Sequence, residues 1–325
     1  MKKKYFLLFI FTFLSFSGPI ILRPPNIEDI KYPNNKAPSL NEIKLGKLLF
    51  FDTRLSKNKK QSCASCHNPD LGFSDGLSKG IGTHGNPLGR NTPSLYNLAW
   101  NNSFFWDGRA KSLEEQALGP IQNPAEMDMN LDDLIIRLES IPKYLELFQK
   151  AYTQTEITKE NIASALASYQ RTLIVNHSPF DQYKKGDINA LSPAQKRGLL
   201  LFRKKALCII CHNGANFTDG SFRSLGIEDG DSGLAGFTKN EKDFGKFKVP
   251  GLRNISKSAP YMHDGSLRSL EEVIRFYNKG GGSAKHKDRL VRKLNLNESE
   301  IFDLISFLSS LNQDMKVKRP QLPKD

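Results

Sequence analysis

The sequence Cys63-Ala64-Ser65-Cys66-His67 recurs in form as Cys208-Ile209-Ile210-Cys211-His212. In each stretch two thiols three residues apart can form thioether bonds to the vinyl groups of one haem, while the adjacent His supplies a proximal nitrogen to the iron. Zinc binding, a thioredoxin-like redox pair and two disulfides are the alternatives. Both pairs are followed at once by His, and no cysteine is left over. The motifs therefore indicate two covalently bound c-type haems, with His67 and His212 as proximal ligands.

Each motif is preceded by the start of a helix. Ser39-Leu40-Asn41-Glu42 is typical of a capping box, and apolar residues follow it at helical spacing. Ser192-Pro193-Ala194-Gln195 has Pro at the first helical position and leads toward Cys208 in the same way. Gly46 and Gly198 occupy similar places in these two helices. A helix leading into a haem motif, repeated 145 residues on, indicates duplicated cytochrome c modules.

The remaining pattern is helical with long connections. Helices are predicted at residues 131–140, 143–152 and 158–173, and Asn297-Glu298-Ser299-Glu300 opens a last helix with an apolar stripe. Residues 72–89 and 213–245 are Gly-rich and aperiodic, so we expect long loops over the haem faces. Sustained strand alternation is absent. The predicted fold is mostly α, with an N-terminal cytochrome c-like domain at residues 39–185 and a C-terminal one at residues 186–325.

The first residues have the layout of a secretory signal peptide. Lys2-Lys3-Lys4 precedes an apolar run at residues 5–16 and small residues up to Gly18. The apolar run is shorter than the ~20 residues of a membrane-spanning helix, which favours a cleaved signal at residues 1–18 over an anchor. Residues 19–38 are rich in Pro and Asn, so we expect an extended N-terminal arm. Export suits haem attachment, which in bacteria takes place outside the cytoplasmic membrane, and predicts a periplasmic protein.

The net charge of the chain limits the classes of partner that it can have. Removal of the three signal lysines from the 47 basic residues leaves 44 against 34 acidic ones, a formal net charge of +10. A basic surface favours nucleic acid, an anionic membrane or an acidic protein. No nucleic-acid motif occurs and export argues against one. The charge is therefore interpreted as solubility or as a bias toward an electron donor with an acidic patch.

The second ligand of each iron decides between electron transfer and catalysis. An iron with two strong axial ligands only passes electrons, whereas one with an open sixth position can bind a substrate such as peroxide. A single His or Met is more often a surface or packing residue than a ligand, so spacing alone does not select one. The candidates are His84, His177, His263, His286, Met127, Met129 and Met262.

Six further runs add specific information. They are Leu45-Gly46-Lys47-Leu48-Leu49-Phe50-Phe51-Asp52, Gly89-Arg90-Asn91-Thr92-Pro93, Phe105-Trp106-Asp107-Gly108-Arg109-Ala110-Lys111, residues 116–127, Ser178-Pro179-Phe180-Asp181 and Ala259-Pro260-Tyr261-Met262-His263-Asp264-Gly265. Together and in this order, the runs resemble the bacterial dihaem cytochrome c peroxidase family, which includes the MauG-like enzymes. The resemblance covers nearly the whole chain after the signal peptide.

The resemblance implies a role for each half of the chain. In that family the N-terminal haem, here at Cys63, Cys66 and His67, is the peroxide site, and the C-terminal haem receives electrons. Gln116 and Glu126 resemble the polar pair over the peroxide-binding haem. A carboxyl group with an amide beside it can shuttle the proton that O–O cleavage requires. From the sequence alone, a solvated carboxylate at a helix start is the preferred interpretation of Glu126.

Three further roles come from the resemblance. Trp106 resembles the tryptophan between the two haems, where an indole offers a path for the electron; a core aromatic is the simpler interpretation, and both can hold. Asn91 and the backbone carbonyls of Ser258 and Pro260 match the calcium position of the family, and oxygen ligands suit this hard cation. His84 matches the loop histidine that caps the peroxide iron in enzymes that need reductive activation. However, its distance from Asn91 is one residue shorter than in the family pattern.

The electron-accepting haem also departs from the usual pattern. By the resemblance, Tyr277 occupies the position of the usual axial Met, and MauG-like enzymes also have Tyr at this position. Met262 is a nearby alternative ligand. A phenolate is a harder, anionic donor that lowers the reduction potential of the iron where Met raises it. Tyr277 is the favoured distal ligand.

These features predict a periplasmic dihaem c-type peroxidase, an oxidoreductase that reduces hydrogen peroxide to water. We expect electrons from a small carrier protein, a cytochrome c or a cupredoxin, through a small and transient contact. The alternatives are a MauG-like enzyme that uses peroxide to oxidise a protein side chain and a non-catalytic dihaem electron carrier or redox sensor. The resemblance also implies a calcium ion and a capacity to form a homodimer.

Overall fold

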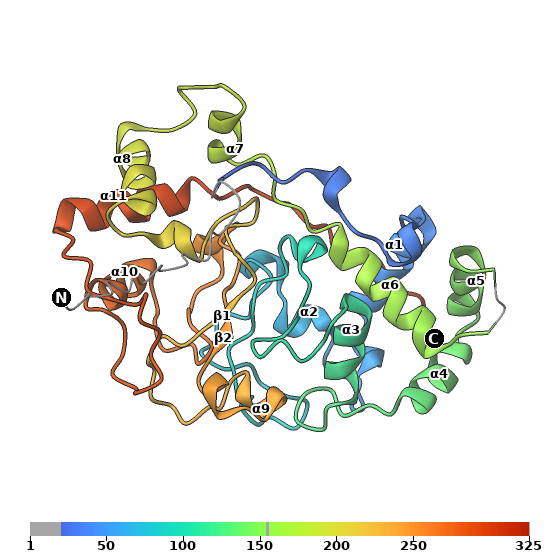
Figure 1. Cartoon of the computed structure of the whole chain (residues 1–325). Helices are drawn as coiled ribbons and strands as arrows, with labels where there is room; N and C mark the ends of the chain where they lie inside the picture. The colour runs from blue at the N-terminus through green and yellow to red at the C-terminus, as the bar shows by residue number, and fades with distance from the viewer. Residues whose placement is uncertain (1–20, 154–155, 325) are drawn as a thin grey trace, which may run out of the picture.

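The computed structural model describes residues 21–153 and 156–324. Most of its regular structure is helical, and the two strands are short (Figure 1). The prediction of a mostly α fold is therefore confirmed. The predicted signal peptide, residues 1–18, lies outside the described residues.

The helices are short and joined by long loops. In chain order the α-helices are α1 (Leu40–Phe51), α2 (Cys63–Cys66), α3 (Leu113–Gln122), α4 (Leu131–Glu139), α5 (Pro142–Ala151), α6 (Lys159–Arg171), α7 (Pro179–Lys184), α8 (Pro193–Arg203), α9 (Ala235–Thr238), α10 (Leu270–Asn278) and α11 (Glu298–Ser309). The strands β1 (Phe222–Arg223) and β2 (Phe247–Lys248) pair antiparallel, with Phe222 opposite Lys248.

The predicted capping boxes are present where the sequence placed them. The Ser39 hydroxyl accepts a hydrogen bond from the Glu42 amide at the start of α1, and the Glu42 side chain accepts one from the Ser39 amide. Ser192 with Gln195 and Asn297 with Glu300 make the same reciprocal contacts at α8 and α11. Each box satisfies two backbone donors that a helix start leaves unpaired.

Two hydrophobic clusters divide the interior. The first gathers buried side chains of α1 and α3 to α6, and its centre is Phe50, Tyr144 and Phe148. The second gathers those of α8, α10 and α11 around Phe202 and Phe307. Figure 1 shows α1 and α3 to α6 toward the right of the molecule and α8, α10 and α11 on the left, with β1 and β2 between them and α7 at the top.

A glycine sets the crossing of the main helix pair in each cluster. A Cβ atom on Gly46 of α1 would collide with the backbone carbonyl of Ala165 in α6. A Cβ atom on Gly198 of α8 would collide with the carbonyl of Asp303 in α11. Only glycine permits such a close backbone approach, so each haem motif is preceded by a helix that lies directly against a partner helix.

A repeat that the sequence analysis missed links the two halves. Residues 91–120 recur 157 positions later, with Pro93, Asn97 and Gly108 matched by Pro250, Asn254 and Gly265. Asn97 and Asn254 both adopt left-handed backbone angles, with φ of 58° and 57°. The clearest shared run is Ser112-Leu113-Glu114-Glu115 and Ser269-Leu270-Glu271-Glu272, which starts α3 and α10 in the same way.

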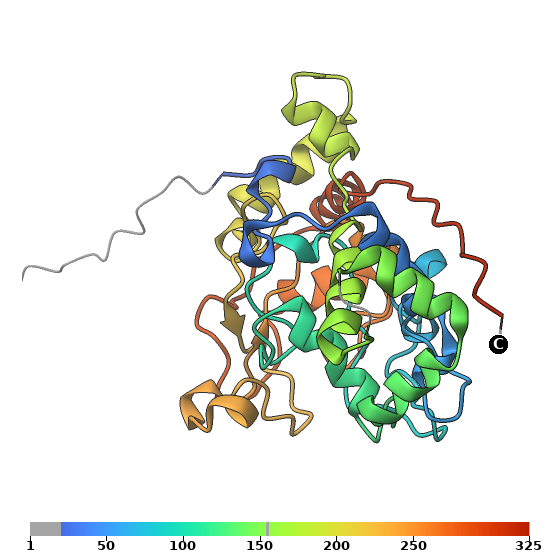
Figure 2. The same cartoon turned by 90° about the vertical axis from the view of Figure 1, so that its right-hand side faces the viewer.

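The chain ends cross between the two clusters. Leu22 of the N-terminal arm packs in the second cluster and forms a parallel bridge with Gly214, although the arm continues into α1 of the first. In the other direction, the segment after α11 places Val317 and Leu322 against the first cluster. Figure 2 shows this last segment running down one side of the molecule. Each half is therefore completed by a terminal segment that arrives from the other side.

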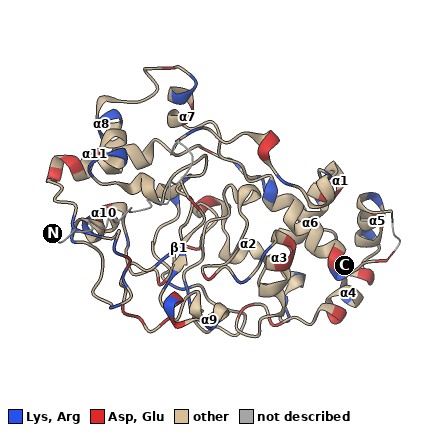
Figure 3. Ribbon diagram, in the orientation of Figure 1, with Lys and Arg blue, Asp and Glu red and all other residues tan. Residues whose placement is uncertain are grey.

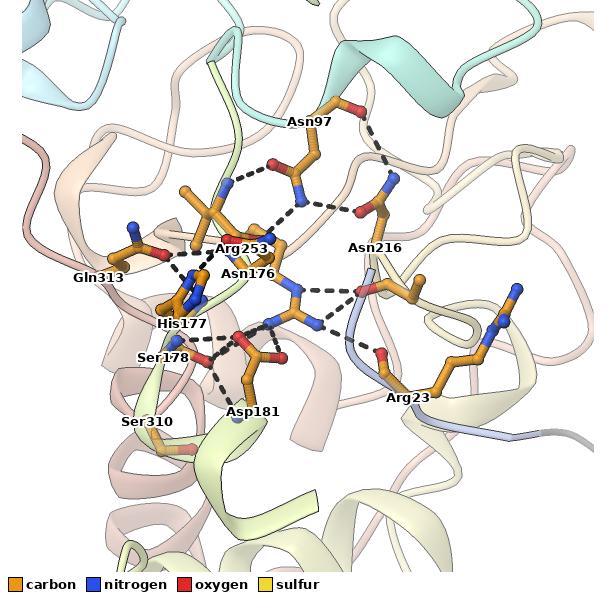
Figure 4. Close-up of polar contacts among 12 residues, drawn as sticks. Arg23, Asn97, Asn176, His177, Ser178, Asp181, Asn216, Arg253, Ser310 and Gln313 are labelled. Carbon is orange, nitrogen blue, oxygen red and sulfur yellow. Dashed lines mark hydrogen bonds and ion pairs between the residues drawn. The ribbon is translucent and has the colours of Figure 1, made fainter. Parts of the chain in front are cut away.

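A buried ion pair fixes the arm and the segment between the halves (Figure 4). The Arg253 guanidinium donates to both carboxylate oxygens of Asp181, at 2.7 and 2.8 Å, and both side chains are almost fully buried. It also donates to the carbonyls of Ala215 and Arg23. The Asp181 carboxylate accepts from the Ser178 hydroxyl. Because its partners come from three other segments, Arg253 ties together parts of the chain that are far apart in sequence.

Within the residues the structure describes, none of the helices has the length and apolar character required to span a membrane.

Candidate haem and peroxide site

The first haem motif holds its histidine in a defined orientation. Cys63 and Cys66 open and close the short helix α2, and His67 follows as its C-cap. The Nδ1 atom of His67 lies 3.0 Å from the Phe73 carbonyl oxygen, so Nδ1 carries the proton. This contact fixes the ring and leaves Nε2 as the nitrogen with a free lone pair.

A cavity opens beside this motif. Cys63, Cys66 and His67 line it together with Gln116 and Glu126, while α1, α3 and α6 contribute apolar side chains. The fold therefore brings Gln116 and Glu126, the two polar residues expected over the first haem, to the cavity that the motif lines. A largely apolar cavity with a few converging polar groups is the usual form of a ligand site.

Glu126 is held at the edge of this cavity. Its Oε1 atom accepts a hydrogen bond of 2.7 Å from the Asn123 amide. Burial raises the pKa of the Glu126 carboxyl, and the Asn123 contact and the positive charge of Arg109 oppose the shift. The group is thus neither the solvated carboxylate of the simplest interpretation nor a tightly paired one. It can hold or release a proton closer to neutral pH than an ordinary Glu.

Gln116 faces the same cavity from α3. Within residues 21–153 and 156–324, its side-chain amide has no protein partner. An amide that is not engaged by the protein can donate to, or accept from, a small polar ligand.

His84 is not brought to the cavity. Its loop approaches the cavity through Ile81 and Gly82, which line it. The imidazole is 54% exposed and its Nε2 lies 3.0 Å from the Asp128 carboxylate. The structure thus places the candidate cap at the surface, bound to Asp128 and outside the lining of the cavity.

The second motif orients its histidine in the same way as the first, but a different side chain lies beside it. Nδ1 of His212 lies 3.0 Å from the Phe217 carbonyl oxygen, as Nδ1 of His67 does from Phe73. Tyr277 of α10 is a titratable side chain close to both cysteines of this motif. Burial raises the pKa of its hydroxyl, with a smaller contribution from nearby Cys208 and Cys211. The structure therefore places Tyr277 beside the second motif.

The repeat separates the two candidate distal residues of this half. Tyr277 occupies the place of Pro120, which lines the cavity of the first half. Met262 occupies the place of Phe105, which does not line it; both have left-handed backbone angles, with φ of 72° and 64°. Position within the repeat thus favours Tyr277 over Met262.

Trp106 lies where the two halves meet. Its indole Nε1 donates a 2.9 Å hydrogen bond to the Asn91 carbonyl. Its ring and that of His263, its counterpart in the repeat, meet edge to face with centroids 6.5 Å apart. The Asn91 amide donates to the His263 carbonyl and the Lys248 amide donates to the Trp106 carbonyl, at 2.7 and 2.8 Å. Asn91 and Lys248 are also counterparts in the repeat. At this junction the two halves are therefore joined by two backbone hydrogen bonds that occupy equivalent positions.

Both proximal histidines are connected to this junction. Burial lowers the pKa of each imidazole, and backbone groups act against the shift: Phe73 and Pro93 at His67, Phe217 and Pro250 at His212. Pro93 stands two residues after Asn91, and Pro250 two residues after Lys248. Trp106 therefore bonds to the backbone of both segments that reach the proximal histidines.

The candidate calcium residues come from two distant segments of the chain that meet at the junction. Asn91 bonds through its amide to His263, which follows Ser258 and Pro260 closely. The Asn91 side chain donates its NH₂ group to the Leu77 carbonyl at 3.0 Å, so its oxygen is directed elsewhere. Oxygen donors of this type fit a hard cation.

One other group of potential metal ligands occurs in the described part of the chain. One ligand atom each of Asp229, Asp231 and His263 lies within 4.8 Å of the others. However, Arg90 already binds both oxygens of Asp231, and His263 Nε2 lies 2.8 Å from the Asp229 carboxylate. These groups are satisfied by each other and by Arg90.

The donor set of the two motifs fits haem better than the alternatives. No cysteine in the described chain forms a disulfide or joins a group of three metal-ligand atoms. Burial raises the pKa of Cys63 and of Cys208 to about 12, which disfavours the reactive thiolate of a redox pair. Each motif retains one imidazole nitrogen for an iron, and the first adjoins a cavity.

Comparison with known proteins was made for the whole chain. Residues 40–189 match the family model of the di-haem cytochrome c peroxidases. The chain is 42% identical to the methylamine utilization protein MauG of Methylorubrum extorquens, over 91% of this chain and 85% of the relative. It is 37% identical to the cytochrome c551 peroxidase of Nitrosomonas europaea, over 86% of this chain and 82% of the relative.

A solved structure agrees with these relatives. The crystal structure of a MauG-like protein associated with microbial copper homeostasis superimposes with a TM-score of 0.82 at 30% identity. The match covers 92% of this chain and 96% of that protein.

Proposed function

The chain belongs to the di-haem cytochrome c peroxidase family, and from this we propose that it reduces hydrogen peroxide to water with electrons from a small carrier protein. The two haems of the family would be attached through Cys63 and Cys66 with His67, and through Cys208 and Cys211 with His212. The proposal includes the domain boundaries 39–185 and 186–325. Most members of the two hydrophobic clusters fall on either side of this division, and the exceptions are the terminal segments and Phe180, which packs in the second cluster.

One observation carries the proposal: a cavity beside the first motif contains Gln116 and Glu126 but not His84. A haem there would supply an iron that binds peroxide and delivers electrons to it. Gln116 offers an uncommitted amide to position the peroxide. Glu126, anchored by Asn123 through one oxygen, keeps its other oxygen available to accept a proton and return it to the departing oxygen atom. An exposed His84 supports a site that is open without prior reduction.

Electrons would enter at the second haem and pass near Trp106. The support is the pair of contacts that Trp106 makes, to the segment before Pro93 and to the segment before Pro250. Among residues 184–205, which lead to Cys208, seven are Lys or Arg and one is acidic. Figure 3 shows basic positions on α7 and α8. These charges support a donor with an acidic face, such as a small cytochrome c or cupredoxin.

A second candidate function is the oxidation of a protein side chain, as in the MauG-like members. The observation that favours it is Tyr277 next to Cys208 and Cys211. A tyrosine ligand lowers the potential of its iron and disfavours easy reduction by a carrier. A dihaem carrier or sensor without catalysis is less well supported, because it gives the cavity, Gln116 and Glu126 no role.

Three subsidiary proposals accompany the function. Periplasmic location follows from the predicted signal peptide and suits c-type haem attachment. A calcium ion at Asn91, Ser258 and Pro260 would lie beside the backbone bond that joins Asn91 to His263. A homodimer is proposed from the resemblance alone.

The test is a stopped-flow mix of hydrogen peroxide with the fully oxidised protein, repeated after reduction by one electron. An immediate reaction of the oxidised form is expected, since His84 lies outside the cavity. With excess reduced cytochrome c, the peroxidase function predicts catalytic oxidation of the carrier at twice the rate of peroxide loss, because each peroxide takes two electrons and each carrier gives one. A rapid peroxide reaction without carrier turnover would instead favour the protein-oxidising function.

A further inference from the structure

Lys248 is a charged residue at the junction for which the proposed reaction gives no role. It is the last residue of β2, and its amide donates to the Trp106 carbonyl at 2.8 Å. Its place in the repeat is that of Asn91, the candidate calcium ligand. At this position of the repeat, the second half therefore has a cationic side chain, Lys248, whereas the first half has Asn91, a side chain that can bind a cation.

The Lys248 ammonium has no acidic partner in the part of the chain that the structure describes. The side chain is half-buried, and within the described residues no hydrogen bond, ion pair or aromatic contact reaches its Nζ atom. Burial lowers the pKa of Lys248 to about 8. By contrast, Lys246, two residues earlier, lies 3.0 Å from the Asp243 carboxylate. An unpaired ammonium removed from water is unfavourable unless an anion accompanies it.

The surroundings of Lys248 point to the second haem motif. The next residue, Val249, donates its amide to Ser221 and accepts at its carbonyl from the Thr218 hydroxyl. Both partners belong to the segment that follows His212. Pro250 then acts through its backbone on the His212 ring. Lys248 is therefore anchored to the loop that holds the proximal histidine of the second half.

We propose that Lys248 is the counter-ion of a propionate of the C-terminal haem and thereby raises the reduction potential of that haem. A haem brings two carboxylates, which provide the anion that the protein itself does not supply. A positive charge beside the propionate offsets part of the negative charge that disfavours adding an electron. The inference rests on the presence of the two haems and not on peroxide turnover.

The experiment is spectroelectrochemical titration of both haems in holoprotein carrying Lys248→Met, with Lys246→Met as the matched control. At a fixed solution potential, the reduced-to-oxidised ratio of the C-terminal haem should fall about tenfold in Lys248→Met, which for one electron is about 59 mV. Lys246→Met should match the wild type, because its ammonium already has Asp243. Haem content per chain, measured as the pyridine haemochrome, establishes that both variants carry two haems.

Lys248→Arg keeps the positive charge and should retain the wild-type potential, so it separates charge from packing. An unchanged C-terminal potential in Lys248→Met, or an equal fall in Lys248→Arg or Lys246→Met, would overturn the proposal. If Lys248→Met loses haem, Lys248→Gln is titrated in its place with the same expected fall. A wild-type protein that carries both haems but does not turn over peroxide would count against the proposed function of the cavity, and the comparison of haem potentials between wild type and Lys248→Met would still test Lys248.

Discussion

The indole of Trp106 and the imidazole of His263 meet edge to face, with 71° between their planes, and they hold the same position in two copies of one repeat. Their environments differ. Trp106 bonds to a backbone carbonyl, whereas His263 stacks on Phe247 at 3.5 Å and lies against the Asp229 carboxylate. One half therefore presents a polarisable ring at the junction, and the other presents an anchored polar one.

Replacement of Glu126 should slow the reaction with peroxide. Glu126→Gln keeps the shape and the contact with Asn123 but cannot accept a proton, so the rate should fall about 10²- to 10⁴-fold. The measurement is the stopped-flow rate with the oxidised protein. Both haem spectra should stay as in the wild type. The control is Glu160→Gln, whose side chain is 70% exposed, and a wild-type rate in Glu126→Gln would remove Glu126 from the mechanism.

The rate of the same reaction should depend on pH through Glu126. Burial raises the pKa of this carboxyl, and the carboxylate is the form that accepts a proton from peroxide. The rate should therefore decrease as the pH falls through a value above the ordinary pKa of Glu, about 4.3. This decrease should be missing from the residual rate of Glu126→Gln. Its persistence there would assign the pH dependence to another group.

Removal of His84 should have little effect on the oxidised protein. His84→Ala deletes an exposed imidazole and its contact with Asp128, so the peroxide rate and the resting spectrum should stay within about twofold of the wild type, since exposed pairs contribute little. A large increase in rate, with a spectrum that changes to that of an open site, would show that His84 caps the iron in solution.

Replacement of Tyr277 should alter the second haem alone. Tyr277→Met exchanges an oxygen donor for a thioether and should raise the potential of that haem by at least the 59 mV that corresponds to a tenfold change in the reduced-to-oxidised ratio. Tyr261→Phe is the matched control, because the Tyr261 hydroxyl donates to the Ile255 carbonyl. If Met262→Leu produces the spectral change and Tyr277→Met does not, Met262 is the ligand.

The buried ion pair of Figure 4 should be important for stability. Asp181→Asn leaves the Arg253 charge buried without its carboxylate, and such a change typically destabilises a protein by about 3–5 kcal/mol. Urea unfolding followed by circular dichroism measures the effect. Asp314→Asn removes the partner of Lys257 at a site where the Asp314 side chain is 94% exposed, and should change stability by about 1 kcal/mol or less. Equal effects of the two changes would contradict the role given to Arg253.

Much of the fold could be predicted because its signals are local. The capping boxes at Ser39, Ser192 and Asn297 and the two haem motifs are contiguous patterns, and each helix begins where its pattern indicates. The starts of α3 and α10 were missed although Ser112 and Ser269 accept from the amides three residues on, as in other N-caps. Comparison of the chain with itself at an offset of 157 would have found both.

The orientation of side chains in loops could not be predicted in the same way. The course of the His84 loop is set by tertiary bonds, from the Thr83 amide to the Glu126 carbonyl and from the Asn58 side chain to the Thr83 carbonyl. No local pattern announces such contacts. Lys248 was missed for a related reason, since a lysine is noteworthy only when its surroundings supply no partner. The sequence named Gln116 and Glu126 only through the family resemblance.

The two backbone bonds of the junction bear on how such a protein can evolve. After a duplication, two modules joined by side chains must keep those side chains, and they remain alike. Here the amides of Asn91 and Lys248 make the joint with carbonyls of the opposite half, and an amide donates whatever side chain it carries. Selection can thus change a residue in one copy only, asparagine to lysine or tryptophan to histidine, without separating the halves. Because the two halves are joined by main-chain hydrogen bonds, the two copies of a duplicated haem module can acquire different side chains and functions while their relative position is kept.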